Sequence, residues 1–197
     1  MNNLFKKLLE NYRLYNAMVD ISSISRRYFV IGFFDGVLTV LGMIMGAHLS
    51  GDASKELIIS AGIATALALG ISSGWGAFEA ERAEQIIAKM EKKKALLKDV
   101  KGCAIDKAHE FAMIVSSIVH GVAPIPAAII PIMPYLFFPL NQAFYFALVL
   151  GLLSLFIVGM FLGKISKTNL IVSGLRMVTA GFVTLLVVTI LSPSHFV

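Results

Sequence analysis

Of the 197 residues of the chain, 57% are apolar and only 15% are charged, and the mean hydropathy is +0.82. An average soluble domain is far less apolar, so this composition excludes a soluble globular protein and indicates an integral membrane protein. The formal net charge of +5 comes from basic residues between the apolar segments and requires no nucleic-acid partner.

Apolar blocks of the length that an α-helix needs to cross a hydrocarbon core of about 30 Å recur along the chain. They predict an all-α membrane protein with five transmembrane helices, at 28–49, 56–78, 110–138, 142–163 and 169–191. The predicted organisation is a cytoplasmic amphipathic helix at 1–27, two spans within 28–78, a cytoplasmic helical segment at 79–109, three spans within 110–191, and a short outer tail at 192–197.

The orientation follows from the Lys and Arg residues between the spans, because basic loops stay on the cytoplasmic side. Residues 1–27, 79–109 and 164–168 are rich in Lys and Arg, whereas the opposite side carries Lys55 alone. We therefore expect the N-terminus in the cytoplasm and the C-terminus outside the cell or in a lumen. The single cysteine, Cys103, falls on the cytoplasmic side and has no second cysteine for a disulfide.

The first span carries an aspartate, Asp35, inside an apolar helix, where a charge costs several kcal/mol unless it faces protein, water or a counter-ion. At 100° per residue, one narrow helix face holds Asp35, Thr39, Gly42 and Gly46, flanked by Gly32, Gly36 and Met43. Small residues let helices approach closely in a membrane, so Asp35 is predicted to point at another helix. Two interpretations follow: a transport group, or a structural carboxylate bonded to Thr39, to backbone or to Arg176.

The second span has a similar stripe of small residues: Gly62, Ala66, Gly70, Ser73 and Ala77. Its helical pattern continues beyond the membrane, with no Gly or Pro before Gly102. This continuation carries Glu79, Glu81, Glu84 and Glu91. Oxygen clusters of this kind suit divalent cations, but Glu interleaved with Lys and Arg is also typical of a solvent-exposed, salt-bridged face.

The third span contains prolines at 124, 126, 131, 134 and 139 and a histidine, His120. Interior prolines remove backbone hydrogen bonds, so the helix is predicted to break, which is typical of transporters and channels. His120 could bind a metal or carry a proton, or it could be a packed, hydrogen-bonded residue. Before this span, Asp106, His109 and Glu110 could join Glu79 and Glu81 around an ion entrance.

The fourth span carries Gly151, Gly159 and Gly163 in its seams, and Arg176 lies one or two turns into the fifth. The sequence contains no Walker loop, nucleophile elbow, HExxH or Cys-pair metal motif. It therefore predicts neither an enzyme nor a nucleotide-driven pump.

Four runs together resemble the vacuolar iron transporter family, in the right order and over the whole chain. DGVLTVLGMIMGA resembles its first-span signature and SSGWGAFEAERAE its second. IPAAIIPIMPYLF is similar to its proline-rich third span, and GLRM to the opening of its last. The resemblance implies a dimer of five-span subunits that exports Fe²⁺, or a similar divalent ion such as Mn²⁺, from the cytoplasm in exchange for protons. It also implies that Asp35 is the pathway carboxylate.

Two features depart from that family. Ser73 and Ala77 stand where the family usually has a pathway methionine and a glutamate, and residues 79–109 are short beside its cytoplasmic metal-binding domain. Glu79, Met43, Met45 or His120 could substitute for the missing ligands. A second hypothesis is therefore a five-helix protein of the same fold that has lost metal transport and carries another solute or acts as an interaction partner.

Under the first hypothesis the divalent metal is a substrate, and no cofactor is tightly bound. The expected partners are membrane lipids and a second copy of the chain. Its expected location is the cell membrane rather than an organelle membrane. The transport pathway is predicted to comprise Asp35, Thr39, Met43, Ser73 and His120. The metal ligands are predicted to come from Asp35, Glu79, Glu81, Glu84, Asp106, His109 and Glu110. The helix-packing glycines, also expected at the dimer contact, are Gly32, Gly36, Gly42 and Gly46.

The orientation can be tested by cysteine labelling. An impermeant maleimide should modify Cys103 only from the cytoplasmic side, and a cysteine introduced by Ser194→Cys in a Cys103→Ser background only from the outside. Labelling of both positions from the same side would contradict the arrangement with five spans.

Overall fold

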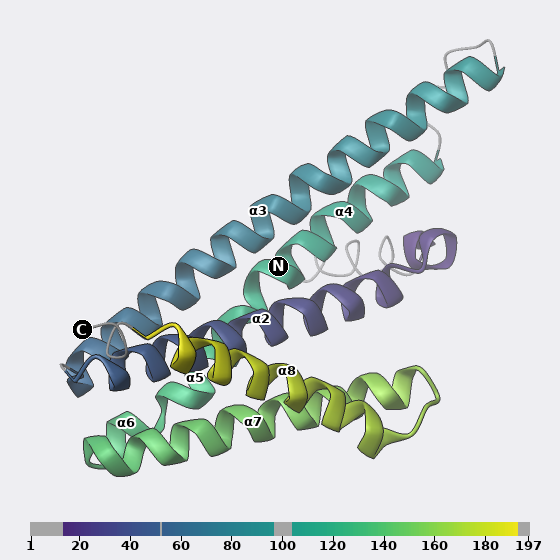
Figure 1. Ribbon diagram of the computed structural model, residues 1–197. Coiled ribbons are helices and arrows are strands. Elements are labelled where there is room, and N and C mark those ends of the chain that lie inside the picture. Colours follow the sequence, from purple (N-terminus) through teal and green to yellow (C-terminus); the bar gives the residue numbers. More distant parts are fainter. Residues whose placement is uncertain (1–13, 52, 97–103, 193–197) are drawn as a thin grey trace, which may run out of the picture. The chain divides into compact units, whose positions relative to one another are not determined.

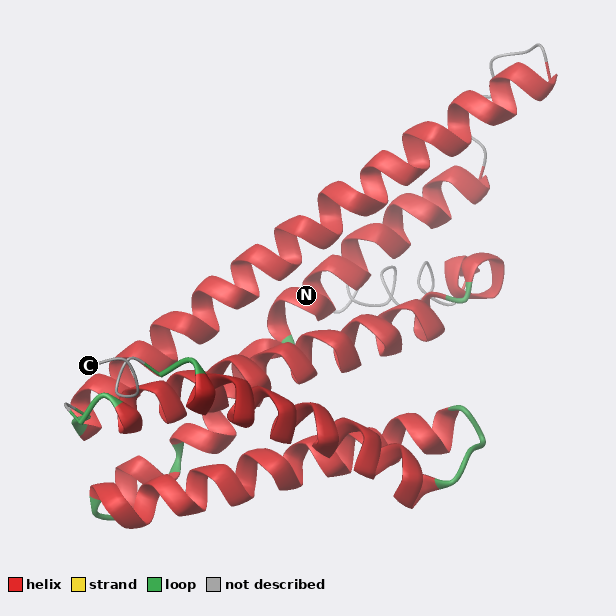
Figure 2. Cartoon of the chain, viewed as in Figure 1, coloured by secondary structure: helices red, strands yellow, loops and turns green. Residues whose placement is uncertain are grey.

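The computed structural model describes residues 14–51, 53–96 and 104–192, and every regular element within them is a helix (Figures 1 and 2). The predicted positions Cys103 and Ser194 lie outside the described residues. The long helices are α2 (Ile21–Leu49), α3 (Lys55–Leu96), α4 (Ala104–Val122), α7 (Leu140–Ile165) and α8 (Leu170–Ile190), and the short ones are α5 (Pro124–Ile132) and α6 (Pro134–Phe137). They form five segments long and apolar enough to cross a membrane, with α4, α5 and α6 together making the third. The predicted all-α fold with five spans is confirmed.

The described residues group into two compact units. The first combines the chain up to Phe29 with Ile71–Gly121, and the second combines Val30–Gly70 with the chain from Val122 onward. The first unit therefore contains the start of α2, the second part of α3 and α4 up to Gly121. The second contains the remainder of α2, the first part of α3, and α5 to α8.

The helix of the first span begins earlier than predicted. Residues 14–19 are helical, and Asp20 interrupts the helix with a positive φ of 47°. Its Oδ1 accepts hydrogen bonds from the Ser22 hydroxyl at 3.0 Å and from the Ser23 backbone N–H at 3.4 Å. An aspartate that accepts a hydrogen bond from the N–H three residues further on caps the start of a helix, so α2 begins at Ile21 and not near residue 28.

The helix α3 is 42 residues long, which corresponds to about 63 Å at 1.5 Å per residue. This is about twice the thickness of a hydrocarbon core. The predicted helical continuation beyond the second span is therefore confirmed, and it extends to Leu96. Its second part lies beside α4 (Figure 1), as contacts of Gln85 and Lys89 with α4 show.

The helical assignment of the proline-rich third span has two short interruptions. Ala123 separates α4 from α5 and Met133 separates α5 from α6. Both residues nevertheless keep right-handed helical dihedral angles, and the Met133 N–H still donates to the Ile129 carbonyl at 2.9 Å. The backbone therefore stays coiled across both interruptions, and extended backbone appears only at Phe138, where φ is −113° and ψ is 156°.

Small residues bring helix backbones together in the second unit. A Cβ atom added to Gly36 would lie 2.7 Å from the carbonyl oxygen of Pro124, so α2 and α5 touch through backbone atoms. The side chain of Leu41 packs against Gly151 of α7, at a place where a Cβ would not fit. Gly159 of α7 lies against the start of α8. The core around these contacts includes the buried residues Val37, Leu41, Ala127 and Leu155. Such packing positions Asp35, which directly precedes Gly36.

We expect Gly36→Ala to destabilise the protein, because its methyl group would need backbone movement in α5. Overpacking of this kind typically costs about 1–3 kcal/mol. Gly46→Ala is the matched control, since within the described part of the chain its Cβ would meet only Val188, at 4.0 Å, and both changes raise helix propensity equally. Thermal unfolding in mild detergent should show a lower melting temperature for Gly36→Ala alone. Equal melting temperatures would contradict the contact.

Candidate functional site

Asp35 is half-buried in α2, in the second unit. Thr39, one turn further, is exposed, whereas Met43 is half-buried and its Cε lies 3.4 Å from the place where Gly62 of α3 would carry a Cβ. The thioether of Met43 therefore packs at the contact between α2 and α3. Arg176, the alternative partner considered for Asp35, is an exposed residue of α8.

The predicted packing glycines of α2 contact helices of their own chain. Gly36 faces α5, while Gly42 and Gly46 face Thr184 and Val188 of α8 at 3.8–4.0 Å. Gly32 is also buried. Gly36, Gly42 and Gly46 therefore pack against helices of the same chain, and their part in a dimer contact stays a prediction.

Ser73 and Ala77 lie on the inner face of α3, half-buried and buried respectively. Next to Ser73, a Cβ on Gly74 would lie 3.2 Å from the Cα of Gly121 and 3.3 Å from the carbonyl oxygen of Ser117. The backbones of α3 and α4 therefore approach closely at this level, immediately beside His120.

His120 is half-buried and hydrogen-bonded to α2. Its Nδ1 lies 3.0 Å from the backbone carbonyl oxygen of Tyr28, and the two rings are 5.2 Å apart. Because a carbonyl oxygen only accepts, Nδ1 must carry a proton, and in the neutral imidazole Nε2 then holds the lone pair. His120 thus has the packed, hydrogen-bonded geometry that was one of the alternatives considered from the sequence.

A cavity of about 270 Å³ lies between the second part of α3 and the start of α4, and we call it the α3–α4 pocket. It is lined by Glu81, Glu84, Gln85, Ala88, Lys89, Asp106 and His109. Four of the predicted metal ligands are therefore gathered here from two helices. Sequence reasoning missed Lys89 as a lining residue, because a helical period does not reveal which residue of a neighbouring helix it faces.

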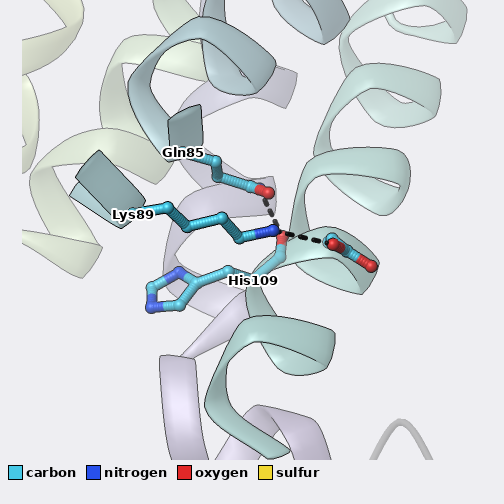
Figure 3. A network of polar contacts seen from close by, with 4 residues as sticks. Gln85, Lys89 and His109 are labelled. Carbon is cyan, nitrogen blue, oxygen red and sulfur yellow. Dashed lines mark hydrogen bonds and ion pairs between the residues drawn. The ribbon is translucent and has the colours of Figure 1, made fainter. Parts of the chain in front are cut away.

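Polar contacts hold the two walls of the pocket together (Figure 3). Gln85 Nε2 donates to the backbone carbonyl of His109 at 2.9 Å, and Lys89 Nζ donates to Glu110 Oε1 at 3.0 Å. Glu79 lies 3.5 Å from Arg82 in a pair exposed to solvent. Glu79 and Glu110 thus have cationic partners, in agreement with the salt-bridged face considered from the sequence.

The pocket carries three carboxylates against one ammonium group, so its charge favours a cation. Across the described ranges, no three His, Cys, Asp or Glu side chains converge closely enough to hold a metal ion. The α3–α4 pocket therefore collects carboxylates without fixing them in a coordination geometry.

Comparison with known proteins decides the family. Residues 26–102 and 78–192 match the VIT family. The chain belongs to the VIT family. It is also 37% identical, over 155 residues, to an uncharacterized protein of Methanocaldococcus jannaschii. That alignment covers 77% of this chain and 80% of the relative.

Membership confirms the resemblance seen in the four sequence runs. VIT-family proteins are membrane transporters of metals or other ions rather than enzymes, and this chain is accordingly a multi-pass membrane protein of a transporter family. The relative from M. jannaschii is itself uncharacterized and adds no substrate.

Proposed function

We propose that this VIT-family protein moves a divalent metal ion, Fe²⁺ or Mn²⁺, out of the cytoplasm, with Asp35 as the ligand within the membrane. The observation that carries the proposal is the half-buried carboxylate of Asp35 in an apolar spanning helix. An ionisable residue at such a position is expensive and is found mainly on ion pathways. A carboxylate binds hard and borderline divalent cations through oxygen and can exchange the bound ion for a proton.

The α3–α4 pocket is proposed as the place where the ion is captured. It supplies oxygen ligands from Glu81, Glu84 and Asp106 and one imidazole from His109. A ligand set of several oxygens and one nitrogen suits Fe²⁺ and Mn²⁺. Zinc more often occupies sites rich in thiolate ligands. Loosely organised ligands also favour release, which a transport protein needs as much as binding.

We further propose that metal export is driven by protons. Asp35 would take up a proton as the metal leaves it, so an opposing proton gradient would drive export. The metal is cargo, and the proposed mechanism uses no tightly bound cofactor. The cell membrane is the proposed location, with Met43, Ser73, Thr39 and His120 as further candidates along the pathway.

We also propose that the protein is a homodimer that joins through the outer face of α3. Small residues recur there at four-residue spacing and are all exposed: Ala64, Ala68, Ser72, Gly76 and Ala80. Among the residues that the structure describes, a Cβ on Gly76 would meet nothing within 4 Å. The opposite face of α3, with Gly62, Ala66 and Gly70, is buried in the chain's own packing. An exposed small-residue stripe suits close helix association in a membrane.

The dimer is tested by disulfide cross-linking in membranes, in a Cys103→Ser background. Ser72→Cys should form an oxidised dimer, because equivalent positions of a two-fold contact lie close together. Val149→Cys, on the exposed face of α7, is the matched control and should stay monomeric. Equal cross-linking of the two variants would contradict an α3 interface.

The alternative function retains support from Ser73 and Ala77, which replace two ligands usual in the family. A protein of this fold that carries another solute would show no metal flux and no dependence on Asp35. The same flux assay therefore separates the two functions.

Asp35→Asn removes the charge but preserves the size of the side chain. We expect metal flux into proteoliposomes to fall by at least about tenfold, with Asp35→Glu retaining a fraction of it. Glu56→Gln, at an exposed position in the first turn of α3, removes a carboxylate elsewhere and should leave flux unchanged. Melting temperatures are measured on the same preparations. A stable Asp35→Asn protein with full metal flux would overturn the site.

A further inference from the structure

The end of α7, the connection that follows it and the start of α8 form a tightly packed turn, residues 163–176, which we call the α7–α8 turn (Figure 1). A Cβ on Gly163 would lie 2.8 Å from Ser173 Oγ, so the two helices pack closely here. The Thr168 N–H donates to the Gly163 carbonyl oxygen at 3.0 Å, and the Asn169 side chain caps the start of α8. The backbone of the turn is therefore well anchored at one end of both helices.

The α7–α8 turn carries three exposed cations, Lys164, Lys167 and Arg176. Among the residues that the structure describes, none of the three forms an ion pair. The sequence also contains no Asp or Glu after Glu110, so no carboxylate of the last three spans accompanies these cations. The turn thus presents a positive charge that the surrounding chain does not compensate.

Arg176 lies inside a membrane-spanning helix. It is the seventh residue of α8, which places it about 9 Å along the helix axis from Leu170. Its neighbours Val172 and Leu175 are exposed apolar residues, so Arg176 belongs to a face of α8 that is suited to lipid. A charge at such a place is costly unless it reaches an anion or water. Helical side chains lean towards the helix N-terminus, which for α8 is the α7–α8 turn, so the guanidinium is directed towards the headgroup region.

Lys167 adopts a backbone conformation that favours glycine. Its φ is 55°, in the left-handed region that other L-residues rarely enter. Residues held in such conformations are concentrated at functional sites. A lysine where glycine would fit more easily therefore indicates that the ammonium group has a use at this turn.

The chemistry of the turn fits the phosphate of a lipid headgroup. Arginine binds phosphate through two parallel hydrogen bonds, and lysine adds a compact charge. A zwitterionic lipid would bring an ammonium group that finds no carboxylate here, so an anionic headgroup fits better. Beside the cations, α7 and α8 expose apolar side chains that suit acyl chains: Phe161, Leu162, Ile165, Ile171, Val172 and Leu175.

We propose that the α7–α8 turn binds an anionic phospholipid, with the headgroup phosphate held by Arg176, Lys164 and Lys167 and the acyl chains along the exposed faces of α7 and α8. The site is separate from the proposed ion pathway and does not depend on which ion the protein carries. A second copy of the chain fits this surface poorly, because a two-fold contact would bring the same cations together.

The test is lipid binding by the purified full chain in mild detergent, measured by native mass spectrometry. One probe is dioleoylphosphatidylglycerol, which is anionic, and the other is dioleoylphosphatidylcholine, which has the same acyl chains and no net charge. The apparent Kd for phosphatidylglycerol should be at least about fivefold lower. Equal affinity for the two lipids would overturn the inference.

Arg176→Gln should raise the apparent Kd for phosphatidylglycerol by at least about fivefold, whereas Arg176→Lys should retain most of the affinity. Lys94→Gln is the matched control, because Lys94 is exposed near the end of α3 and the change removes the same net charge. The control should bind phosphatidylglycerol as the wild type does. Wild-type affinity in Arg176→Gln, or an equal loss in Lys94→Gln, would contradict a site at the turn.

Lys167→Gly separates lipid binding from folding. Glycine relieves the positive φ, which offsets the greater freedom of the unfolded chain, so the melting temperature should stay close to that of the wild type. The apparent Kd for phosphatidylglycerol should nevertheless rise by about fivefold. Unchanged affinity in this variant would overturn the role of Lys167 and with it the proposed site. A change in oligomeric state with unchanged lipid affinity would assign the surface to a second copy and overturn the proposal.

Discussion

The contact between Gly36 and Pro124 determines where the carboxylate of Asp35 lies. Because Gly36 has no side chain, the backbone of α2 reaches the carbonyl oxygen of Pro124, at the first residue of α5. The preceding residue is Asp35, so its place relative to α5 is set by backbone contact within one compact unit and not by a flexible side chain. A membrane interior offers little hydrophobic drive for helix association, so close packing of this kind supplies much of the stability.

The same chain uses small residues for two purposes on α3. The inner face, with Gly62, Ala66 and Gly70, receives neighbouring side chains such as Ile132 and Met43. The outer face, around Gly76, has no such neighbour among the described residues. Beyond the span, the helix becomes polar and contributes one wall of the α3–α4 pocket. One continuous helix therefore carries a packing surface, an exposed stripe of small residues and part of the lining of the α3–α4 pocket.

Helix content and the approximate limits of the five spans could be predicted from the sequence, because hydrophobic length and basic flanks are local properties of a chain. The start of α2 could not, since it depends on the capping geometry of Asp20 with Ser22 and Ser23. The carboxylates of the pocket were predicted in part from their positions on facing segments. Which carboxylates of this region have a cationic partner depends on contacts between helices, such as Lys89 with Glu110. The hydrogen bond from the Tyr28 hydroxyl to Glu81 was missed because the two residues are 53 positions apart, and a tyrosine near a membrane boundary is usually only an interfacial anchor.

The central claim is that the protein carries a divalent metal ion across a membrane. The most direct measurement is the flux of Mn²⁺ and of Fe²⁺ in liposomes that contain the purified wild-type protein, with and without an imposed pH gradient. The account predicts saturable flux above that of empty liposomes, accelerated when protons move in the opposite direction to the metal. Metal flux no greater than that of empty liposomes, under both conditions and for both ions, would contradict it.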